Sequence, residues 1–297
     1  MQNNEAAFLD SLREQAKRLI ITGVVLLVML PLTASIFDGL EAIVGAGCFI
    51  AAIVCFLRSA KKAKEYKQYF KKVFVTNMIK EIMPEAEYFP EGGFSKDCIR
   101  ETGLMMMGNR YHSEDYIKGT YNGVAFERAD IYIADESTDS DGNSSTTVYL
   151  EGRWMVFETN KSFEADLQII QKGFGYAKKK KGIFTRKAER RHEIKTEDEN
   201  FNSHFTCLCQ NDTEAFYLLT PGIMQSMETL VSSSNAKFMV GFVDNRIHVA
   251  VHTRRDSLEP SIFRKMDFEK ERQEIVNEMN AITDFISALK LDRHIFR

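Results

Sequence analysis

Two uncharged apolar runs near the start of the chain dominate its hydrophobic pattern. Residues 19–37 and 42–57 contain no Lys, Arg, Asp or Glu, and residues 38–41 form a polar corner between them. A bilayer core is roughly 30 Å thick and needs about 20 apolar residues as helix, so the runs predict two membrane-spanning helices. The first run is too long for the apolar region of a cleaved signal peptide. A buried helical hairpin of a soluble domain is the alternative interpretation.

Positive charges lie on one side of this hairpin. Arg13, Lys17 and Arg18 precede the first run, and five Lys or Arg residues lie at positions 58–67, after the second run. The corner instead carries Asp38 and Glu41. By the positive-inside rule, we expect a two-pass protein with both termini in the cytoplasm.

Small residues are frequent in the second run. Ala42 with Ala46, and Gly47 with Ala51, have the small-xxx-small spacing that lets helices approach closely. Packing within the hairpin and self-association of hairpins both fit this pattern. The absence of charge within the runs argues against a proton relay or an ion path.

The chain after the hairpin first continues as a helix. Aromatic and aliphatic residues recur at helical spacing through residues 59–83, with lysines between them, and Pro84 ends the pattern. We therefore expect a transmembrane hairpin at 1–58, a helical stalk at 59–84 and a cytosolic domain at 85–297. A split into two subdomains near residues 171–195 stays open.

Strand patterns begin after residue 116. Residues 117–121, 124–133, 146–158 and 164–170 are rich in β-formers, and Asn122-Gly123 predicts a hairpin turn. Residues 85–109 look irregular. Residues 135–145 form an acidic, Ser- and Gly-rich loop that does not match a calcium-binding EF-hand, so a solvated hairpin tip is predicted.

The last third of the chain alternates strands and helices. Residues 202–210 read as a strand, Pro221 opens a helix at 222–231, and Asp244-Asn245 joins strands at 237–243 and 246–253. Residues 267–291 read as a helix with a narrow apolar stripe that docks on the sheet, with a coiled coil with a partner as the alternative. The predicted fold class is α+β: the two-helix transmembrane hairpin and helical stalk, then a mixed β/α cytosolic domain ending in a helix.

Composition narrows the picture only slightly. The chain has 297 residues, 44% of them hydrophobic. Its formal net charge is −3, so the overall charge does not favour nucleic acid as a partner. Two of its five cysteines lie in the second apolar run. This distribution does not suggest a disulfide framework and fits a reducing cytosol.

The most basic stretch of the chain spans residues 171–195. It reads as a solvated loop, as a surface that docks on anionic lipid near the membrane, or as a nucleotide or nucleic-acid site. The candidate contacts with anionic lipid or ligand are Lys178, Lys179, Lys180, Lys181, Arg186, Lys187, Arg190 and Arg191.

Histidines and cysteines offer only weak chemical signals. His204 with Cys207 and Cys209 invites a metal interpretation, but in a strand the three do not share a face. His248 and His252 share a strand face, and His112 lies beside two acidic residues. Because no nucleophile elbow, P-loop or zinc-protease motif is present, we expect no enzyme, no cofactor and no metal ligands.

Several segments resemble the DUF3137 family of uncharacterised, membrane-associated bacterial proteins. The resemblance covers residues 103–297 and is carried by residues 111–119, Gly152, 160–163, 201–205, 212–221, 259–263 and 291–296. Glu-Ala-Phe-Tyr-Leu-Leu-Thr-Pro at 214–221 and Glu-Pro-Ser-Ile-Phe at 259–263 are its more specific runs. The family implies no activity and no catalytic residues. It implies the inner membrane, and a LemA-type membrane protein as a partner.

Together these patterns predict a membrane-anchored protein whose cytosolic domain is a binding or scaffold module for an envelope-associated partner. The basic stretch and the loop at 135–145 are its expected contact surfaces. A ligand-gated oligomeric membrane effector, which would make the chain a homo-oligomer, is the alternative. An enzyme without a recognisable motif is a second, weaker alternative.

Overall fold

A computed structural model describes residues 2–36, 41–159, 163, 166–175, 191–233, 236–254 and 258–291. The chain forms two compact units. Unit 1 comprises Met1–Met78 and Leu258–Ile275, and unit 2 comprises Ile79–Ser257 and Val276–Arg297. The domain bounds expected at residues 58 and 84 stay predictions.

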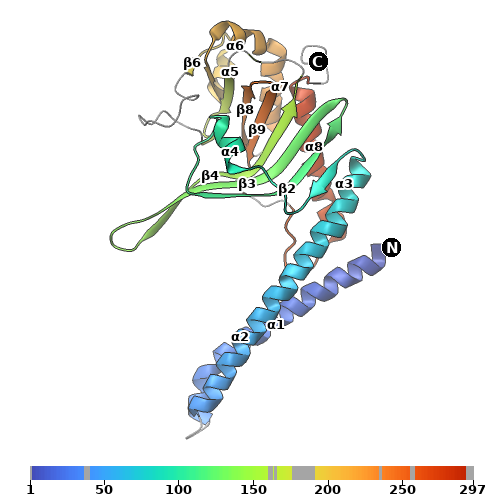
Figure 1. Ribbon diagram of the computed structural model, residues 1–297, viewed down its shortest axis with the longest axis vertical. Helices are drawn as coiled ribbons and strands as arrows, with labels where there is room; N and C mark the ends of the chain where they lie inside the picture. Colours follow the sequence, from blue (N-terminus) through green and yellow to red (C-terminus); the bar gives the residue numbers. More distant parts are fainter. Residues whose placement is uncertain are drawn as a thin grey trace. The chain divides into compact units, whose positions relative to one another are not determined.

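Unit 1 is built on two long helices that lie side by side, α1 (Gln2–Ile36) and α2 (Glu41–Tyr69) (Figure 1). The π-helix η1 (Phe70–Val75) continues α2 and leads into α3 (Thr76–Ile82). Close approach of α1 and α2 is possible where side chains are small. A Cβ added to Gly23 would lie 3.0 Å from the Phe56 ring, and the Ser59 hydroxyl donates to the Ala16 carbonyl at 3.1 Å.

Both helices are long and apolar enough to cross a membrane, by length and composition. Their apolar side chains point outward to an unusual degree: Val28 is 64% exposed, Ile43 71% and Leu57 67%. Single exposed apolar residues are common on soluble proteins, but a contiguous apolar surface is not. The outer surface of the two helices therefore has the character expected of a lipid-facing one.

The small-residue pairs do not lie between the helices. Ala42, Ala46, Gly47 and Ala51 are exposed, and a Cβ added to Gly47 would meet no atom within 4 Å. In this structure these pairs therefore do not pack between the two helices of the hairpin.

Unit 2 contains one antiparallel sheet of nine strands in the order β1-β2-β3-β4-β9-β8-β5-β7-β6 (Figure 1). The strands are β1 (Glu87–Phe89), β2 (Arg110–Tyr121), β3 (Val124–Thr138), β4 (Ser144–Glu158), β5 (Leu167–Gln171), β6 (His192–Ile194), β7 (Phe205–Cys209), β8 (Lys237–Val243) and β9 (Arg246–His252). The predicted α+β class is confirmed. Strands before and after residues 171–195 belong to the same sheet.

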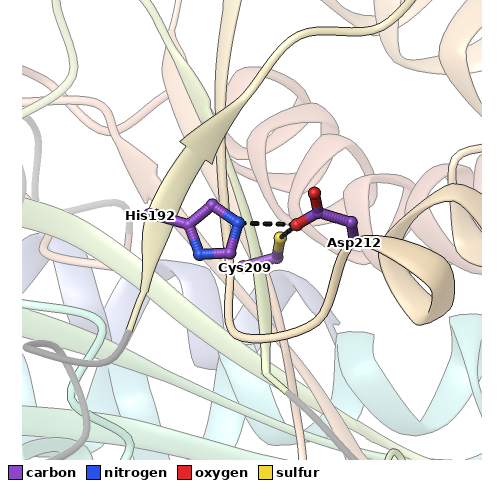
Figure 2. A group of neighbouring side chains, drawn as sticks. All are labelled: His192, Cys209 and Asp212. Atoms are coloured by element: carbon purple, nitrogen blue, oxygen red, sulfur yellow. Dashed lines mark hydrogen bonds and ion pairs between the residues drawn. The ribbon is translucent and has the colours of Figure 1, made fainter.

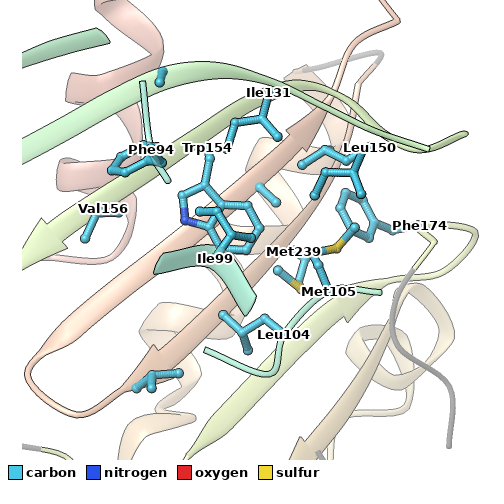
Figure 3. Close-up of a cluster of buried hydrophobic side chains, with 14 of the residues drawn as sticks. Phe94, Ile99, Leu104, Met105, Ile131, Leu150, Trp154, Val156, Phe174 and Met239 are labelled. Carbon is cyan, nitrogen blue, oxygen red and sulfur yellow. The ribbon is translucent and has the colours of Figure 1, made fainter. Parts of the chain in front are cut away.

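The two faces of the sheet are covered by different elements. Met239 of β8 belongs to a cluster with Trp154 of β4 and Ile99 of α4 (Lys96–Glu101), which lies over one face (Figure 3). The neighbouring residue Phe238 contacts Phe285 of α8 (Phe268–Ala288), with ring centroids 5.6 Å apart. Successive residues of a strand point to opposite faces, so α4 and the unit 2 part of α8 cover opposite sides.

Local sequence signals explain two of the hairpin turns and the start of one helix. The turn between β2 and β3 has positive φ at both Asn122 (50°) and Gly123 (77°), which is the type I′ geometry that Asn-Gly favours. The predicted hairpin at Asp244-Asn245 and the helix after Pro221, α7 (Pro221–Ser233), are also confirmed.

Two stretches differ from the prediction. Residues 85–109 are not simply irregular, because they contain β1 and α4. Residues 202–204 are not strand but the end of α5 (Glu199–His204), whose first turn is capped where the Phe201 N–H donates to Asp198 Oδ1 at 3.1 Å. A helix this short is not stable by itself, and such a side-chain cap contributes to its stability.

Candidate functional site

Of the eight basic residues predicted to contact lipid or ligand, only Arg191 is described, and it is buried. Lys178, Lys179, Lys180, Lys181, Arg186, Lys187 and Arg190 lie outside the described residues. The Arg191 guanidinium pairs with Asp166 at 2.8 Å and donates to the carbonyls of Thr102 and Gly103 at 3.1 and 3.0 Å. With these partners inside unit 2, Arg191 anchors the chain rather than offering a surface cation.

The other end of the basic stretch is also fixed in unit 2. Phe174 is buried in the Trp154 cluster, and a Cβ added to Gly175 would lie 3.5 Å from the Tyr149 carbonyl oxygen of β4. The described residues on both sides of positions 176–190 are therefore held in unit 2, beside β4 at Gly175 and at Arg191.

The predicted hairpin at 135–145 is the tip of a longer ribbon made by β3 and β4. The last β2–β3 pair is Arg110 with Ala134, and β9 pairs with β4 only from Gly152 onward. Pairing of β3 with β4 nevertheless continues to Thr138 opposite Ser144. Residues 135–148 therefore form a two-stranded ribbon that extends away from the rest of the sheet (Figure 1). We call this segment the β3–β4 ribbon.

The β3–β4 ribbon is acidic and ordered by its own polar contacts. Its four charged residues, Asp135, Glu136, Asp139 and Asp141, are all carboxylates. Asp139 Oδ1 accepts from the backbone N–H groups of Asp141 and Asn143 at 3.0 and 2.8 Å. These hydrogen bonds, first that from the Asn143 backbone, lower the pKa of Asp139. The tip is therefore a preformed turn that carries negative charge.

One edge of the β3–β4 ribbon is covered, and within the part of the chain that the structure describes the other edge is open. The Asn109 side chain imitates a strand partner of β3: its Nδ2 donates to the Glu136 carbonyl at 2.6 Å, and its Oδ1 accepts from the Glu136 N–H at 2.9 Å. Among the described residues, no strand pairs with the outer edge of β4 at residues 144–148. Such an edge can accept another extended chain.

A second polar feature lies inside unit 2, where charges meet between the sheet and α8. Arg128 is fully buried and pairs with Asp130 at 2.8 Å and with Glu278 at 2.9 Å. Arg153 also pairs with Glu278, and the Tyr88 hydroxyl donates to Asp115. The Arg128 guanidinium reaches the Asp115 carbonyl at 3.3 Å. This buried charge cluster holds two guanidiniums and three carboxylates.

The carboxylates of the buried charge cluster outnumber its guanidiniums, and this affects the pKa of Asp130. Burial, above all, raises the pKa of Asp130 to about 7, assisted by the carboxylates of Asp115 and Glu278 and opposed by Arg128. Asp130 also lines a cavity of about 130 Å³ with His112, Glu114 and Glu151. A proton bound by Asp130 removes one negative charge from the cluster.

We expect the stability of unit 2 to fall as pH rises from about 4 to about 7. The pKa of Asp130 is higher in the folded chain, about 7, than its ordinary 3.8, so the folded state binds more protons in this window. Asp130→Asn should flatten this dependence. Urea unfolding followed by Trp154 fluorescence tests it, because Trp154 is the one tryptophan of the chain. An unchanged slope in the variant would assign the pH dependence to other groups.

The other histidines singled out in the sequence contact neighbouring groups of unit 2. His112 is exposed and lies 3.2 Å from Glu114, whereas Asp115 is fully buried. His248 accepts from the Trp154 indole N–H at 3.2 Å, and His252 Nδ1 accepts from the Glu151 N–H at 3.1 Å. Burial, with help from Arg254, lowers the pKa of His252. These contacts are structural.

A mixed group of possible metal ligands forms where β6, β7 and α6 (Asp212–Leu218) meet (Figure 2). The Nε2 of His192 lies 2.6 Å from Asp212 Oδ1, and the Cys209 thiol donates to the same oxygen at 3.5 Å. Burial and the nearby Asp212 raise the pKa of Cys209 to about 11. His204 and Cys207, grouped with Cys209 in the sequence, do not belong to this group.

Residues 148–291 match the model of the DUF3137 family, which is described as a protein of unknown function. The predicted DUF3137 resemblance is confirmed over this segment. Comparison with curated proteins gave no match. The crystal structure of the mycobacterial trehalose monomycolate transport factor A, TtfA, is similar at a TM-score of 0.39 and 10% identity, over 73% of this chain and 96% of that chain.

The DUF3137 segment contains β4 from residue 148 onward, the charge-cluster residue Glu278, and the His192–Cys209–Asp212 group. It leaves out residues 111–119, which were part of the predicted resemblance. The Glu-Pro-Ser-Ile-Phe run lies within the match, and in unit 1 its Glu259 pairs with Lys67 and with Lys71, the latter at 2.9 Å. Sequence reasoning gave this glutamate no role.

Proposed function

We propose that this chain is a membrane-anchored binding or scaffold module rather than an enzyme. The exposed apolar surface of α1 and α2 supports the anchor, and the distribution of Lys and Arg supports a two-pass inner-membrane topology with both termini in the cytoplasm. In this arrangement unit 2 faces the cytosol and presents its binding surface there.

The observation that carries the binding role is the β3–β4 ribbon. An isolated two-stranded ribbon contributes little to stability, and among the described residues outside the ribbon the polar partners of residues 135–148 are Asn109 and Arg110. An extension that does so little for folding, with one open edge and four carboxylates, suits an intermolecular contact.

The chemistry of the ribbon defines the partner it would bind. An extended segment that adds to the outer edge of β4 would satisfy the backbone groups of residues 144–148, while Lys or Arg side chains would pair with Asp135, Asp139 and Asp141. We therefore propose a protein partner at the membrane that offers a basic, extended segment. The family resemblance suggests a LemA-type protein.

Shortening the β3–β4 ribbon should abolish partner binding without unfolding unit 2. The variant replaces residues 137–145 by Asn-Gly, which closes the hairpin at the pair Glu136 and Thr146. A photo-crosslinker at Thr147, present in both proteins, should give at least about tenfold less partner adduct in the variant, equivalent to about 1.4 kcal/mol of lost affinity.

The control is a crosslinker at Thr229 of α7, an exposed position away from the ribbon. Its adducts should be equal in both proteins, and so should the unfolding midpoint reported by Trp154. A partner that the shortened variant still captures at full yield would remove the ribbon from the binding surface.

The alternative function is a ligand-gated oligomeric membrane effector. Phe174 and Arg191, on either side of residues 176–190, are both held in unit 2, and this favours the alternative. A ligand bound by residues 176–190 would then be coupled directly to the sheet. In this proposal the seven cations other than Arg191 contact anionic lipid or a small anionic ligand. A change in stoichiometry in native membranes on adding anionic lipid would distinguish it from a static scaffold.

A further inference from the structure

We propose that His192, Cys209 and Asp212 form a binding site for one divalent transition-metal ion, with zinc as the best match. The site is independent of the scaffold function and of the β3–β4 ribbon. It lies on a different edge of the sheet, where the short strand β6 pairs with β7.

The fold brings these three residues together through strand register and a turn. His192 and Cys209 are direct partners on antiparallel strands, so their side chains lie on the same face of the sheet. Asn211 then caps α6, its Oδ1 accepting from the Thr213 N–H at 2.9 Å, and this cap makes Asp212 the first residue of the helix. Three elements thus direct one donor each to one point (Figure 2).

The distances are close to those of a tetrahedral site. Bonds of about 2.0–2.3 Å from zinc to N, O and S place neighbouring ligand atoms roughly 3.4–3.6 Å apart. The distance from Cys209 Sγ to Asp212 Oδ1 is already 3.5 Å. The 2.6 Å between His192 Nε2 and the same oxygen must widen, and the His192 ring, with 52% of its side chain exposed, has room to rotate. All three ligand atoms lie within 4.8 Å of one another.

The donor set selects the class of metal. Calcium and magnesium prefer oxygen ligands, whereas one thiolate, one imidazole and one carboxylate suit zinc or a chemically similar ion. Cys209 is buried, but His192 and Asp212 are exposed, so the ion would be open to solvent on one side. Three protein ligands with a water or an external ligand in the fourth position complete a tetrahedral site.

A metal here would fasten the edge of the sheet. Strand β6 has three residues, and it directly follows Arg191 within the basic stretch. A bond from the ion to His192 would tie this strand to β7 and α6, and so would help to fix Arg191 and the end of the basic stretch. The fourth position would remain available to a ligand.

Cobalt titration of the full chain in detergent tests the site, because Co²⁺ reports its own ligands. We expect one equivalent to give thiolate-to-cobalt absorption with tetrahedral d–d bands, and Zn²⁺ to displace it. His192→Gln and Asp212→Asn should each weaken binding by at least about 100-fold, the upper end of the loss from a missing outer-shell group. Cys209→Ser should abolish the thiolate band.

Two controls are matched to the ligands. Cys207→Ser changes the other cysteine of β7, and His204→Gln changes a nearby exposed histidine; both should retain full binding. His192 and Asp212 are exposed, so their variants should fold, which Trp154 fluorescence verifies. The proposal is overturned if cobalt gives no thiolate band, if the band depends on Cys209 alone, or if Cys207→Ser weakens binding as much as His192→Gln.

Discussion

Replacing Arg128 by Met should destabilise unit 2 by about 3–5 kcal/mol, the cost of breaking a buried ion pair by removing one partner. Met approximates the volume of the Arg side chain but leaves Asp130, 2.8 Å from the guanidinium, without its nearest counter-charge, and leaves Glu278, at 2.9 Å, paired with Arg153. Urea unfolding of the full chain in detergent, followed by Trp154 fluorescence, measures the change because the single tryptophan lies in unit 2.

Arg110→Met is the matched control. Arg110 lies on the neighbouring strand β2 and also pairs with a glutamate, Glu136, but 65% of its side chain is exposed. Removing it should change the free energy of unfolding by no more than about 0.5 kcal/mol. Adding Asp130→Asn to Arg128→Met should recover part of the loss, because it removes the carboxylate that has lost its nearest counter-charge, whereas Glu278 still pairs with Arg153. Equal effects of the two arginine substitutions would contradict a special role for the buried charge cluster.

Trp154→Ala should lower the free energy of unfolding of unit 2 by about 3–5 kcal/mol, as expected for a fully buried aromatic. Trp154 is 0% exposed and lies at the centre of the cluster beneath α4. The substitution removes that packing and the indole donor to His248. Because it also removes the fluorescent probe, pulse proteolysis in urea should follow the unfolding of this variant.

Trp154→Phe separates packing from hydrogen bonding. It keeps most of the ring contacts with the cluster but loses the indole N–H, so we expect a smaller cost than for Ala, near the 1–3 kcal/mol of an unmet buried polar group. A Phe variant as unstable as the Ala variant would show that the hydrogen bond to His248, rather than the packing, holds the cluster together.

The parts of this fold that sequence predicted well are those fixed by neighbouring residues. Asn122-Gly123 supplies the positive φ angles of its own turn, and Pro221 opens its own helix. The short helices α4 and α5 were missed, although Ser95 and Asp198 cap them, because one capping residue before a single turn is common without a helix.

The functional features were harder to predict, because register and tertiary packing create them. His192 and Asp212 are 20 residues apart and meet only because β6 pairs with β7 at Cys209. Arg128 and Glu278 are separated by 150 residues, and nothing in the alternation of β3 marks Arg128 as buried. The length of the β3–β4 ribbon depends on where β2 and β9 stop pairing, which no local pattern reports.

The short strands at the two ends of the sheet have a consequence for aggregation. Both β1 and β6 are three residues long. Edges of this length offer too few free backbone groups to recruit another chain into a growing fibre. The long open edge of β4 at residues 144–148 carries mainly Ser and Thr, with carboxylates nearby, instead of an apolar stripe. A strand that joined it would therefore find backbone hydrogen bonds without a hydrophobic surface, which favours reversible pairing with a chosen partner over irreversible self-assembly.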